Sequence, residues 1–542
     1  MPSPARWKQT LSHASRSRSF LWKLAIGIIL AGAAIGTALH RVAPPAPGTF
    51  DQRVLTTLPF LSDTSPAALA ALSENLFRSF ERELADPALA PEDFLDALPR
   101  LRPLLTGETV RVSALVAKRF TPATGALVAD FLLLDSPHTT AASTARERLE
   151  ISATREPPVP FANYLLGLHA REKNDLPAAA RYFIAEGRSP EAHAARDHAI
   201  QSLLDSNQFT ALEALVREPA YAGLLTPYDH LDLAVARHDW PAILRTLPAA
   251  QFATHLDGAL ALTLVTGIAW AFFLFHLGEN RRALSATTAL CLTALVLGAL
   301  STFPTICAAI WQEDMLGLGA NTESLPYLAY QVGGVGLREE LSKLLLLLPL
   351  VPFLVSRGDE REALLVASFI GLGFAIEENG GYFLNSHGID APGRFLSANF
   401  LHIALTGLNG LAFVRIFTRG TAGLNQFLAI FPLTILVHGL YNGLPAVVEL
   451  QELGPFLAMT IFVLFSVSYF NRTHELRENE RMTLSLTGAF VFSISLVAAA
   501  VLIEQISAIG LGAGLTALFP EFLATGILIL MFTRVFNEGL SE

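Results

Sequence analysis

The sequence predicts an all-α protein: a polytopic membrane helix bundle of about ten spans, with an α-helical, repeat-like soluble domain between the first and second spans. Three observations lead to this fold class. Of the 542 residues, 52% are hydrophobic and only 16% are charged, whereas soluble domains carry about 25% charged residues. The mean hydropathy is positive, at +0.43. Apolar runs long enough to cross a bilayer recur from residue 256 onward, and residues 41–255 contain none.

This composition also limits the function. It excludes a wholly soluble enzyme and a disordered chain. The net charge is −10, so nothing in the chain indicates a nucleic-acid partner. The two cysteines, Cys291 and Cys307, lie in apolar stretches, which excludes a disulfide framework and a cysteine-based zinc site. The lipid bilayer is therefore the first partner that the sequence implies.

The N-terminus combines a basic segment with an apolar one. Residues 1–19 form a basic tail without acidic residues, and residues 20–40 form an apolar run long enough to span a bilayer. We interpret this run as an uncleaved anchor, because no convincing Ala-x-Ala cleavage site follows it; the alternative is a signal peptide. Since a basic flank stays in the cytoplasm, both interpretations place the chain from residue 41 outside it.

Residues 41–255 are expected to form an extracytoplasmic helical domain. Apolar residues recur there at helical spacing, and a short pattern that begins at Asp175, Asn207 and Asp239 repeats every 32 residues. Asp or Asn at these positions is expected to cap the second helix of a helix pair. The region 160–250 resembles tetratricopeptide repeats, whose period is about 34 residues; the alternative is a helical domain without true repeats. Because such repeats bind peptides or proteins, the resemblance implies a protein partner.

The membrane domain is predicted at residues 256–535. Four of its loops carry nine arginines, whereas the opposite loops carry only Arg394. Because cytoplasmic loops are enriched in Lys and Arg, the four loops are assigned to the cytoplasm, and both termini are then cytoplasmic. These loops are residues 278–284, 356–362, 415–424 and 471–482. The expected spans are residues 20–39, 256–276, 285–306, 329–355, 363–385, 396–417, 425–448, 454–470, 483–503 and 514–533.

Four consecutive predicted spans contain polar and ionisable residues, which are costly in the hydrocarbon region and rarely occur there without a role. From the helix rise of 1.5 Å per residue, these groups are expected at overlapping depths, between the midplane and the outer face. Together they offer a general base, a cation beside it and donors for an oxyanion, as hydrolysis of an amide requires. They are Glu339, Glu340 and Lys343 in the first span, Glu378 and Asn379 in the second, His402 in the third, and His438 and Asn442 in the fourth.

These motifs resemble the PrsW family of intramembrane proteases, relatives of the CAAX-prenyl-protease and bacteriocin-immunity group. The matching stretches are Glu339-Glu340-x-x-Lys343, Phe374-x-x-x-Glu378-Asn379, His402-x-x-x-Thr406-Gly407 and His438-Gly439-x-x-Asn442. The Glu at the end of the second motif, where the CAAX-protease branch would have His, favours the PrsW side. The resemblance covers about residues 325–450, the expected protease core. It implies cleavage of membrane-associated protein or peptide substrates, within or near a bacterial-type inner membrane.

The resemblance leads to a hypothesis for the base. Either Glu339 or Glu340 activates a water molecule, and Lys343 holds the other carboxylate. Two adjacent carboxylates do not both ionise cheaply in a low dielectric, so the lysine is expected to adjust the pair. The large segment at 41–255 departs from the minimal core of the family and leaves substrate choice open.

The remaining residues are expected to act on the oxyanion. His402 and His438, helped by Asn442 or Asn379, bind it, while Glu378 orients one histidine or serves as a second acid. The alternative is a zinc site formed by Glu378, His402 and His438. We favour catalysis without a cofactor, because these ligands lie on separate helices and no His-Glu-x-x-His pair is present.

Two other classes of function remain open from the sequence. An ion-coupled transporter also uses intramembrane Glu, His and Lys, although no inverted repeat is evident. A non-catalytic sensor would bind its partner through the repeat-like domain and use the membrane domain only as an anchor. The intact Glu-Glu, His and His positions argue against such an inactive core.

The arginine bias makes the topology testable. Reporter fusions are expected to place residue 150 outside the cytoplasm and residues 360 and 475 inside it, because Lys and Arg mark cytoplasmic loops. Alkaline phosphatase and fluorescent-protein fusions at these three positions measure the two sides independently. A cytoplasmic signal at residue 150 would reject this topology.

Overall fold

The computed structural model describes most of the chain as helix. The described residues are 10, 12–42, 50, 54, 66–136, 138–256, 260–278, 285–319, 325–450, 453–477 and 484–536. They form α-, 3-10 and π-helices and no strand, which confirms the predicted all-α class. Most of the basic tail and the loop segments 279–284 and 478–483 lie outside the described residues. The chain divides into two compact units, residues 46–246 and residues 1–45 with 247–542.

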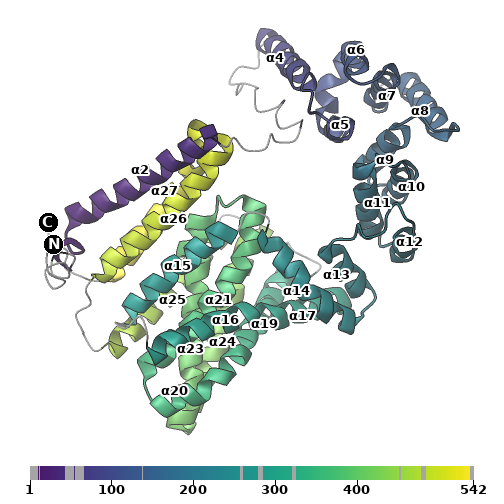
Figure 1. Ribbon diagram of the computed structural model, residues 1–542. Coiled ribbons are helices and arrows are strands. Elements are labelled where there is room, and N and C mark those ends of the chain that lie inside the picture. Colours follow the sequence, from purple (N-terminus) through teal and green to yellow (C-terminus); the bar gives the residue numbers. More distant parts are fainter. Residues whose placement is uncertain are drawn as a thin grey trace. The chain divides into compact units, whose positions relative to one another are not determined.

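Residues 46–246 form a series of short helices (Figure 1). A proline occupies the first turn of α5, α7, α10 and α13, where a missing N–H costs no hydrogen bond. The helices bury one apolar core that includes Phe94, Phe131 and Phe183. The helices are α4 (Pro66–Leu84), α5 (Pro91–Leu105), η1 (Thr106–Glu108), α6 (Thr109–Arg119), α7 (Pro122–Leu133), α8 (Thr139–Thr154), α9 (Ala162–Glu172), α10 (Leu176–Gly187), α11 (His193–Asp205), α12 (Phe209–Leu215) and α13 (Pro227–Ala236), followed by α14 (Trp240–Leu256).

Three helix pairs, α9–α10, α11–α12 and α13–α14, share one turn geometry. A residue with positive φ lies in each turn: Asn174 (59°), Asn207 (55°) and His238 (54°). The side chains of Asp175 and Asp239 then accept from backbone N–H groups of the next helix, as predicted for caps. The prediction that Asn207 caps α12 is wrong. Asn207 takes the left-handed position, which tolerates Asn, so its turn is shifted by one residue and α12 begins after Gln208.

The second unit is a bundle of long apolar helices. Among the described residues, nine helices are long and apolar enough to cross a membrane, including α2, which lies beside α26 (Figure 1). Its elements are α2 (Arg18–Val42), α15 (Leu260–Leu277), α16 (Ala286–Leu300), α17 (Thr302–Ile310), η2 (Trp311–Met315), α18 (Leu325–Tyr330), η3 (Gln331–Gly336), α19 (Leu337–Leu347), η4 (Leu348–Leu350), α20 (Val351–Arg357), α21 (Glu360–Ser386), α22 (Ala391–Leu396), α23 (Ala398–Arg419), α24 (Thr421–Gly443), η5 (Leu444–Ala446), η6 (Val448–Leu450), α25 (Leu453–Leu476), α26 (Leu486–Ile509) and α27 (Leu511–Val535).

Of the ten predicted spans, the one at residues 329–355 is not among these nine helices. It is helical throughout, but as a succession of α18, η3, α19, η4 and α20 from residue 325 to residue 357. The middle of this run carries Arg338, Glu339, Glu340 and Lys343, so its composition is not that of an ordinary span. Its π-helical segment η3 lies directly before the three ionisable residues of α19. Such segments are rare and often lie at functional sites.

Close backbone contacts bring the central helices together. A Cβ added at Gly371 of α21 would lie 2.2 Å from the carbonyl oxygen of His402 in α23. A Cβ added at Gly439 of α24 would lie 2.3 Å from the Cα of Val332 in η3. Only glycine permits these two approaches, which place α21 against α23 and η3 against α24. The helices that carry the predicted site residues are therefore packed directly on one another.

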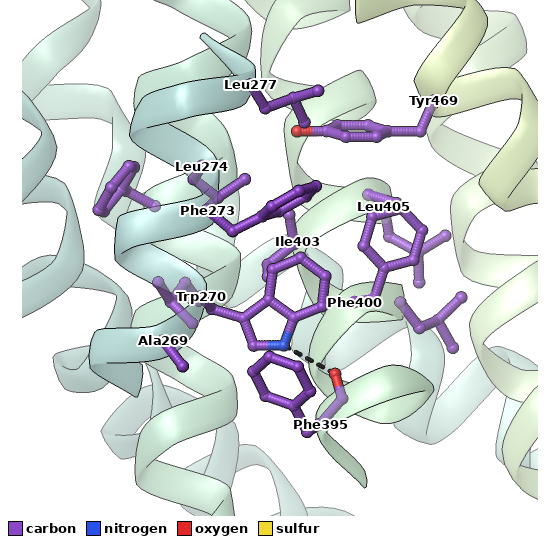
Figure 2. Packing of buried hydrophobic residues seen from close by; sticks show 14 of the residues in the cluster. Ala269, Trp270, Phe273, Leu274, Leu277, Phe395, Phe400, Ile403, Leu405 and Tyr469 are labelled. Atoms are coloured by element: carbon purple, nitrogen blue, oxygen red, sulfur yellow. Dashed lines mark hydrogen bonds between the residues drawn. The ribbon is translucent and has the colours of Figure 1, made fainter. Parts of the chain in front are cut away.

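A buried tryptophan fixes the short helix between α21 and α23. Trp270 of α15 donates its indole N–H to the carbonyl oxygen of Phe395 in α22, at 2.7 Å (Figure 2). Its ring also packs on Phe395 and Phe400, with ring centroids 5.0 and 5.4 Å apart. Since Trp270 is completely buried, this bond satisfies its only donor. The contact holds α22 in place, and with it Arg394.

The contact between α21 and α23 gives a testable prediction for stability. Gly371→Ala is expected to lower the free energy of unfolding by about 1–3 kcal/mol, the usual cost of overpacking. The matched control is Gly526→Ala in α27, where an added Cβ meets nothing within 4 Å; it is expected to be neutral or to stabilise by about 0.5–1 kcal/mol. Thermal unfolding of the two variants in detergent measures the difference. Equal melting temperatures would contradict the close approach.

Candidate active site

Helix α19 supplies two carboxylates and one cation. The ammonium Nζ of Lys343 lies 2.8 Å from Oε1 of Glu340 and 3.5 Å from Oε2 of Glu339. Glu340 and Lys343 are 0% exposed and Glu339 is 6% exposed. The spacing of four residues places Glu339 and Lys343 on one helix face, where they form the longer ion pair, whereas the hydrogen bond of Lys343 forms with Glu340, three residues before it. Lys343 therefore neutralises mainly the second carboxylate of the pair.

His438 of α24 lies between the two carboxylates. Its Nδ1 is 3.0 Å from Oε1 of Glu340, within hydrogen-bond distance. Its Nε2 is 3.4 Å from Oε2 of Glu339, beyond hydrogen-bond geometry. Among the described residues, Oε2 of Glu339 is buried and has no hydrogen-bond partner. Oε2 of Glu340 is likewise buried without a partner, so each carboxylate keeps one oxygen with free lone pairs, but Glu340 is held at its other oxygen by two hydrogen bonds.

His402 of α23 uses both of its ring nitrogens. Nδ1 lies 2.9 Å from Nζ of Lys343, and Nε2 lies 3.1 Å from Oε2 of Glu378 in α21. An ammonium group only donates, so Nδ1 accepts, and the proton of the neutral ring is on Nε2, where it is donated to Glu378. Phe374 covers this contact, with its ring centroid 4.1 Å from the ammonium nitrogen. His402 is therefore oriented from both sides.

Arg394 completes the outer end of the cluster, and sequence reasoning missed it. Its Nη2 donates to Oε2 of Glu378 at 2.8 Å and its Nε donates to Oδ1 of Asn379 at 2.7 Å. Its guanidinium carbon lies 3.5 Å from the ring centroid of Tyr382. From the sequence, Arg394 was only the single arginine of the outer loops. That isolation was the signal that could have identified it, because every other loop arginine fell on the opposite side.

The two candidate asparagines are placed differently. Asn379 is completely buried, and its Nδ2 donates to Oδ1 of Asn399 at 2.9 Å. With Arg394 on its oxygen, its side chain serves to hold α21, α22 and α23 together. Asn442, one turn after His438 on α24, lines a pocket instead. The geometry therefore favours Asn442 over Asn379 as a group that contacts substrate.

A small pocket opens beside the two histidines. Its volume is about 90 Å³, which is enough for several water molecules, since one needs about 10–15 Å³. Glu339, Glu340, Lys343 and Asn379 do not line it, so both histidines lie between the pocket and the carboxylates of α19. The lining residues are Glu378, Tyr382, Arg394, Ser397, Ala398, Leu401, His402, His438, Tyr441 and Asn442.

The side chains form one continuous chain of contacts with alternating charge. It runs from Arg394 through Glu378, His402, Lys343, Glu340 and His438 to Glu339. Three carboxylates face two permanent cations, so one further proton in the cluster makes it neutral. Burial favours that neutral state. Carboxylates and histidines in mutual contact are groups that exchange protons, so the cluster has the composition that general acid–base chemistry needs.

One group of side chains in the cluster has the composition of a metal site. Among the described residues, Glu339, His402 and His438 form a group whose ligand atoms all lie within 4.8 Å of one another. The carboxylate grouped with both histidines is thus that of Glu339, not that of Glu378 as the sequence suggested. One Glu and two His suit zinc, and Glu340 on Nδ1 of His438 resembles the orienting carboxylate of such sites. However, both nitrogens of His402 are engaged and the Lys343 ammonium lies among the ligand atoms, so this arrangement does not fit a metal as it stands.

A second group of this kind lies in the unit of residues 46–246 and comprises Asp135, His169 and Glu172. Arg102 and Lys173 already pair with Asp135 at 2.7 Å each, and Arg102 also binds Glu172. Burial lowers the pKa of His169 to about 4, so the ring stays neutral. These contacts join α5, α9 and the end of α7, and they point to a structural ion-pair network.

Comparison with known proteins gives one match. Residues 286–469 match the family described as PrsW family intramembrane metalloprotease. The match covers about a third of the chain and includes every predicted site residue. It supports an intramembrane protease activity for the membrane bundle. No curated protein and no solved structure matches the chain significantly.

The buried cation gives a prediction for stability. Lys343→Met is expected to lower the free energy of unfolding by about 3–5 kcal/mol, because it leaves buried carboxylates without their counter-ion. Adding Glu340→Gln is expected to restore part of this loss, because it removes one of the uncompensated charges. Denaturant unfolding of the two single variants and the double variant measures the coupling. Strictly additive losses would contradict the pairing.

Proposed function

We propose that the chain is an intramembrane endopeptidase that hydrolyses peptide bonds of membrane-associated protein substrates. The family match over residues 286–469 supports the class of activity. The observation that carries the mechanism is the buried Oε2 of Glu339, which has no hydrogen-bond partner among the described residues and lies 3.4 Å from Nε2 of His438. This oxygen accepts no hydrogen bond and has only longer contacts, of 3.5 Å to Nζ of Lys343 and 3.4 Å to Nε2 of His438, so its lone pairs are available to accept the proton of a water.

Glu339 is the better candidate for the general base of the two adjacent glutamates. One oxygen of Glu340 receives both Lys343 and Nδ1 of His438, and these two donors reduce its basicity. Glu339 keeps only the longer contact of 3.5 Å to Lys343. We assign Glu340 to hold the lysine and the histidine in place, and Glu339 to accept the proton of the attacking water.

The proposed reaction balances with these groups alone. Glu339 takes a proton from water as the water oxygen bonds to the scissile carbonyl carbon. The carbonyl oxygen becomes an oxyanion, which the Asn442 amide stabilises from the pocket side. His438, whose single N–H in the neutral form is donated to Glu340, joins it when the further proton of the cluster is on Nε2. The C–N bond then breaks, and the proton passes from the cluster to the leaving amine. Glu339 returns to its carboxylate form, and one water has been consumed.

His402 has a positioning role in this proposal. Both of its nitrogens are already bonded, to Lys343 and to Glu378, so it offers no free donor to an oxyanion. Its two contacts link Arg394, through Glu378, to Lys343 beside the base, so His402 keeps these groups in a fixed arrangement. The sequence led to the hypothesis that both histidines bind the oxyanion. In this proposal only His438 keeps that role.

Zinc is the alternative cofactor, and we propose catalysis without it. When bound, zinc would polarise the carbonyl and lower the pKa of a bound water, and Glu339, His402 and His438 would hold it. For His402 to bind zinc, either the contact of Lys343 with Nδ1 of His402 or the contact of Glu378 with Nε2 has to break. Either change separates a pair that lies within 3.1 Å in this arrangement.

We also propose a placement and a partner for the remaining chain. The arginine bias supports a multi-pass protein of a bacterial-type inner membrane, with residues 41–255 extracytoplasmic. The helix pairs from α9 to α14 offer the kind of surface on which repeat proteins bind peptides, which supports a role in recruiting or excluding substrate. The second acid/histidine group there is neutralised by Arg102 and Lys173, so we assign no chemistry to this domain.

The base assignment is tested by Glu339→Gln. This change keeps size and hydrogen bonding but removes the ionisable carboxylate, and we expect kcat to fall about 10²–10⁴-fold at unchanged stability. Glu340→Gln is expected to lower both kcat and the melting temperature, because Lys343 and His438 lose a partner. Cleavage of a library of single-span peptides by the purified chain in bilayers measures the rates, with products identified by mass spectrometry.

The matched control is Glu504→Gln, at an exposed carboxylate of α26, which is expected to cleave like the wild type. Equal specific activity of wild type and Glu339→Gln would remove Glu339 as the base and return the transporter hypothesis to first place. A chelator is expected to leave the rate unchanged. Activity lost on chelation and restored by zinc would support the zinc alternative.

A further inference from the structure

Two polar residues of α23 are buried without partners on the side of the helix that carries His402. Thr406 and Asn409 are 0% exposed. Within the described part of the chain, neither the Thr406 hydroxyl nor the oxygen and nitrogen of the Asn409 amide has a hydrogen-bond partner. Burying such groups in a membrane bundle without partners is costly. A bound ligand that the fold is built to hold removes this cost.

The three residues His402, Thr406 and Asn409 form one row. Their spacing of four and then three residues places them on one helix face, and at 1.5 Å per residue the row is about 10 Å long. The neighbouring face, which includes Gly407 and Gly410, is pressed against Ser368 and Ala367 of α21. The row starts at His402, which contacts Phe374 and Glu378 of α21, and continues along α23 beside the glycine face.

Several other buried hydroxyls of the bundle are bonded within their own helix, whereas those of Thr406 and of Thr263 have no partner among the described residues. Ser368, Thr434, Ser466 and Thr473 all donate to a backbone carbonyl of their own helix, at 2.7–2.9 Å. This local bond is the common way for Ser and Thr to be satisfied inside a helix. The Thr406 hydroxyl does not make it, so its proton is directed to something outside α23.

The chemistry of the row selects the ligand. A cation would satisfy the oxygens of Thr406 and Asn409 but would leave the amide N–H donors unpaired, and Lys343, bonded to His402 at the head of the row, would repel it. An anion would face the three carboxylates of the cluster. Water both donates and accepts, so it satisfies the hydroxyl, the amide oxygen and the amide nitrogen together.

Aromatic side chains close the far end of the row. Phe413 is one turn beyond Asn409, and its ring packs against Phe427 of α24 and Phe417, with centroids 5.4 and 5.6 Å apart. An apolar end of this kind separates the row from the C-terminal end of α23. The row thus begins at the cluster and ends at these aromatic rings.

We propose that Thr406 and Asn409 bind ordered water inside the bundle, and that this water site supplies the molecule consumed in hydrolysis. The binding site stands on the unpartnered groups alone; its supply role rests on the proposed protease function. An intramembrane hydrolase has to draw water from an apolar surrounding, and a store one to two helix turns from His402 of the cluster shortens that path. Thr406 and Asn409 are positioning residues for water and do not contact substrate.

Radiolytic hydroxyl-radical labelling of the full-length chain in nanodiscs tests the binding site without using activity. A short X-ray pulse generates radicals from bound water, and these oxidise the side chains beside it. We expect oxidation of Phe413, which is partly buried, to exceed that of Phe272, a partly buried ring of α15, by about tenfold. In Asn409→Leu, which replaces the amide with an apolar group of similar size, we expect the two residues to label equally.

Kinetics test the supply role. Asn409→Leu and, as a second variant, Thr406→Val are expected to lower kcat about tenfold, the scale of one lost hydrogen bond, with KM unchanged. Their melting temperatures are expected to stay level or rise, because an unpartnered polar group is replaced by an apolar one. The matched control is Thr473→Val, which removes a hydroxyl bonded within its own helix and is expected to leave kcat unchanged.

The outcomes separate the two claims. Equal labelling of Phe413 and Phe272 in the wild type would overturn the water site. Labelling as expected, together with wild-type kcat in both folded variants, would overturn its role in supply. A fall in kcat that is matched by a fall in melting temperature in both variants would assign Thr406 and Asn409 to structure and overturn the proposal. A wild type that cleaves nothing would remove the proposed function, while the labelling would still decide the water site.

Discussion

The ammonium group of Lys343 is the interaction on which the rest of the cluster depends. It is completely buried and bonds to Glu340 and His402, which lie on different helices. Because an ammonium has only donors, Nδ1 of His402 has to accept. The N–H of the neutral ring is then on Nε2, and it is donated to Glu378. One cation thereby fixes the charge of a carboxylate and the tautomer of a histidine. Arg394 in turn binds Glu378, and both of these residues line the pocket.

Such short contacts require helices that approach closely. Helix axes usually pack 8–10 Å apart, and the side chains of α19, α21, α23 and α24 meet here within about 3 Å of one another. The glycines at Gly371 and Gly439 bring backbones together, and the π-helical turn η3 precedes the three ionisable residues of α19. The backbone is thus adapted to the electrostatics, because a slightly wider bundle would leave buried charges without partners.

The fold class was predictable because hydrophobicity alone decides it. Long apolar runs have few solutions other than helices, and the soluble segment showed helical spacing. The turn at Asn207 was not predictable, since Asn suits both a cap and a left-handed residue, and only the register of the turn decides between them. The span at residues 329–355 was predicted, but not its division into segments, which depends on packing against α24.

The site was predictable as a set of residues but not as a network. Charges in apolar spans identified all eight candidates, because the bilayer makes such charges rare. Pairing was not predictable, since it depends on the rotation of each helix: Glu378 was a reasonable metal ligand until Glu339 proved to lie with both histidines. Arg394 was missed because a loop position gave no sign that Trp270 and Phe395 would fix α22 above the cluster.

The partnered and unpartnered groups in this bundle separate structure from chemistry. A network of hydrogen bonds that joins several helices rigidifies a core, as the bonds of Asn379 to Asn399 and Arg394 do beside Glu378, although Nδ2 of Asn399 has no partner among the described residues. A buried group left without a partner is costly, and in lipid it has no solvent to turn to. Such groups persist where a ligand completes them. Oε2 of Glu339 lies beside the pocket histidine, and Thr406 and Asn409 extend the row from His402. Their common feature is that water is the molecule that satisfies all of them, and water is also the second substrate of a hydrolase.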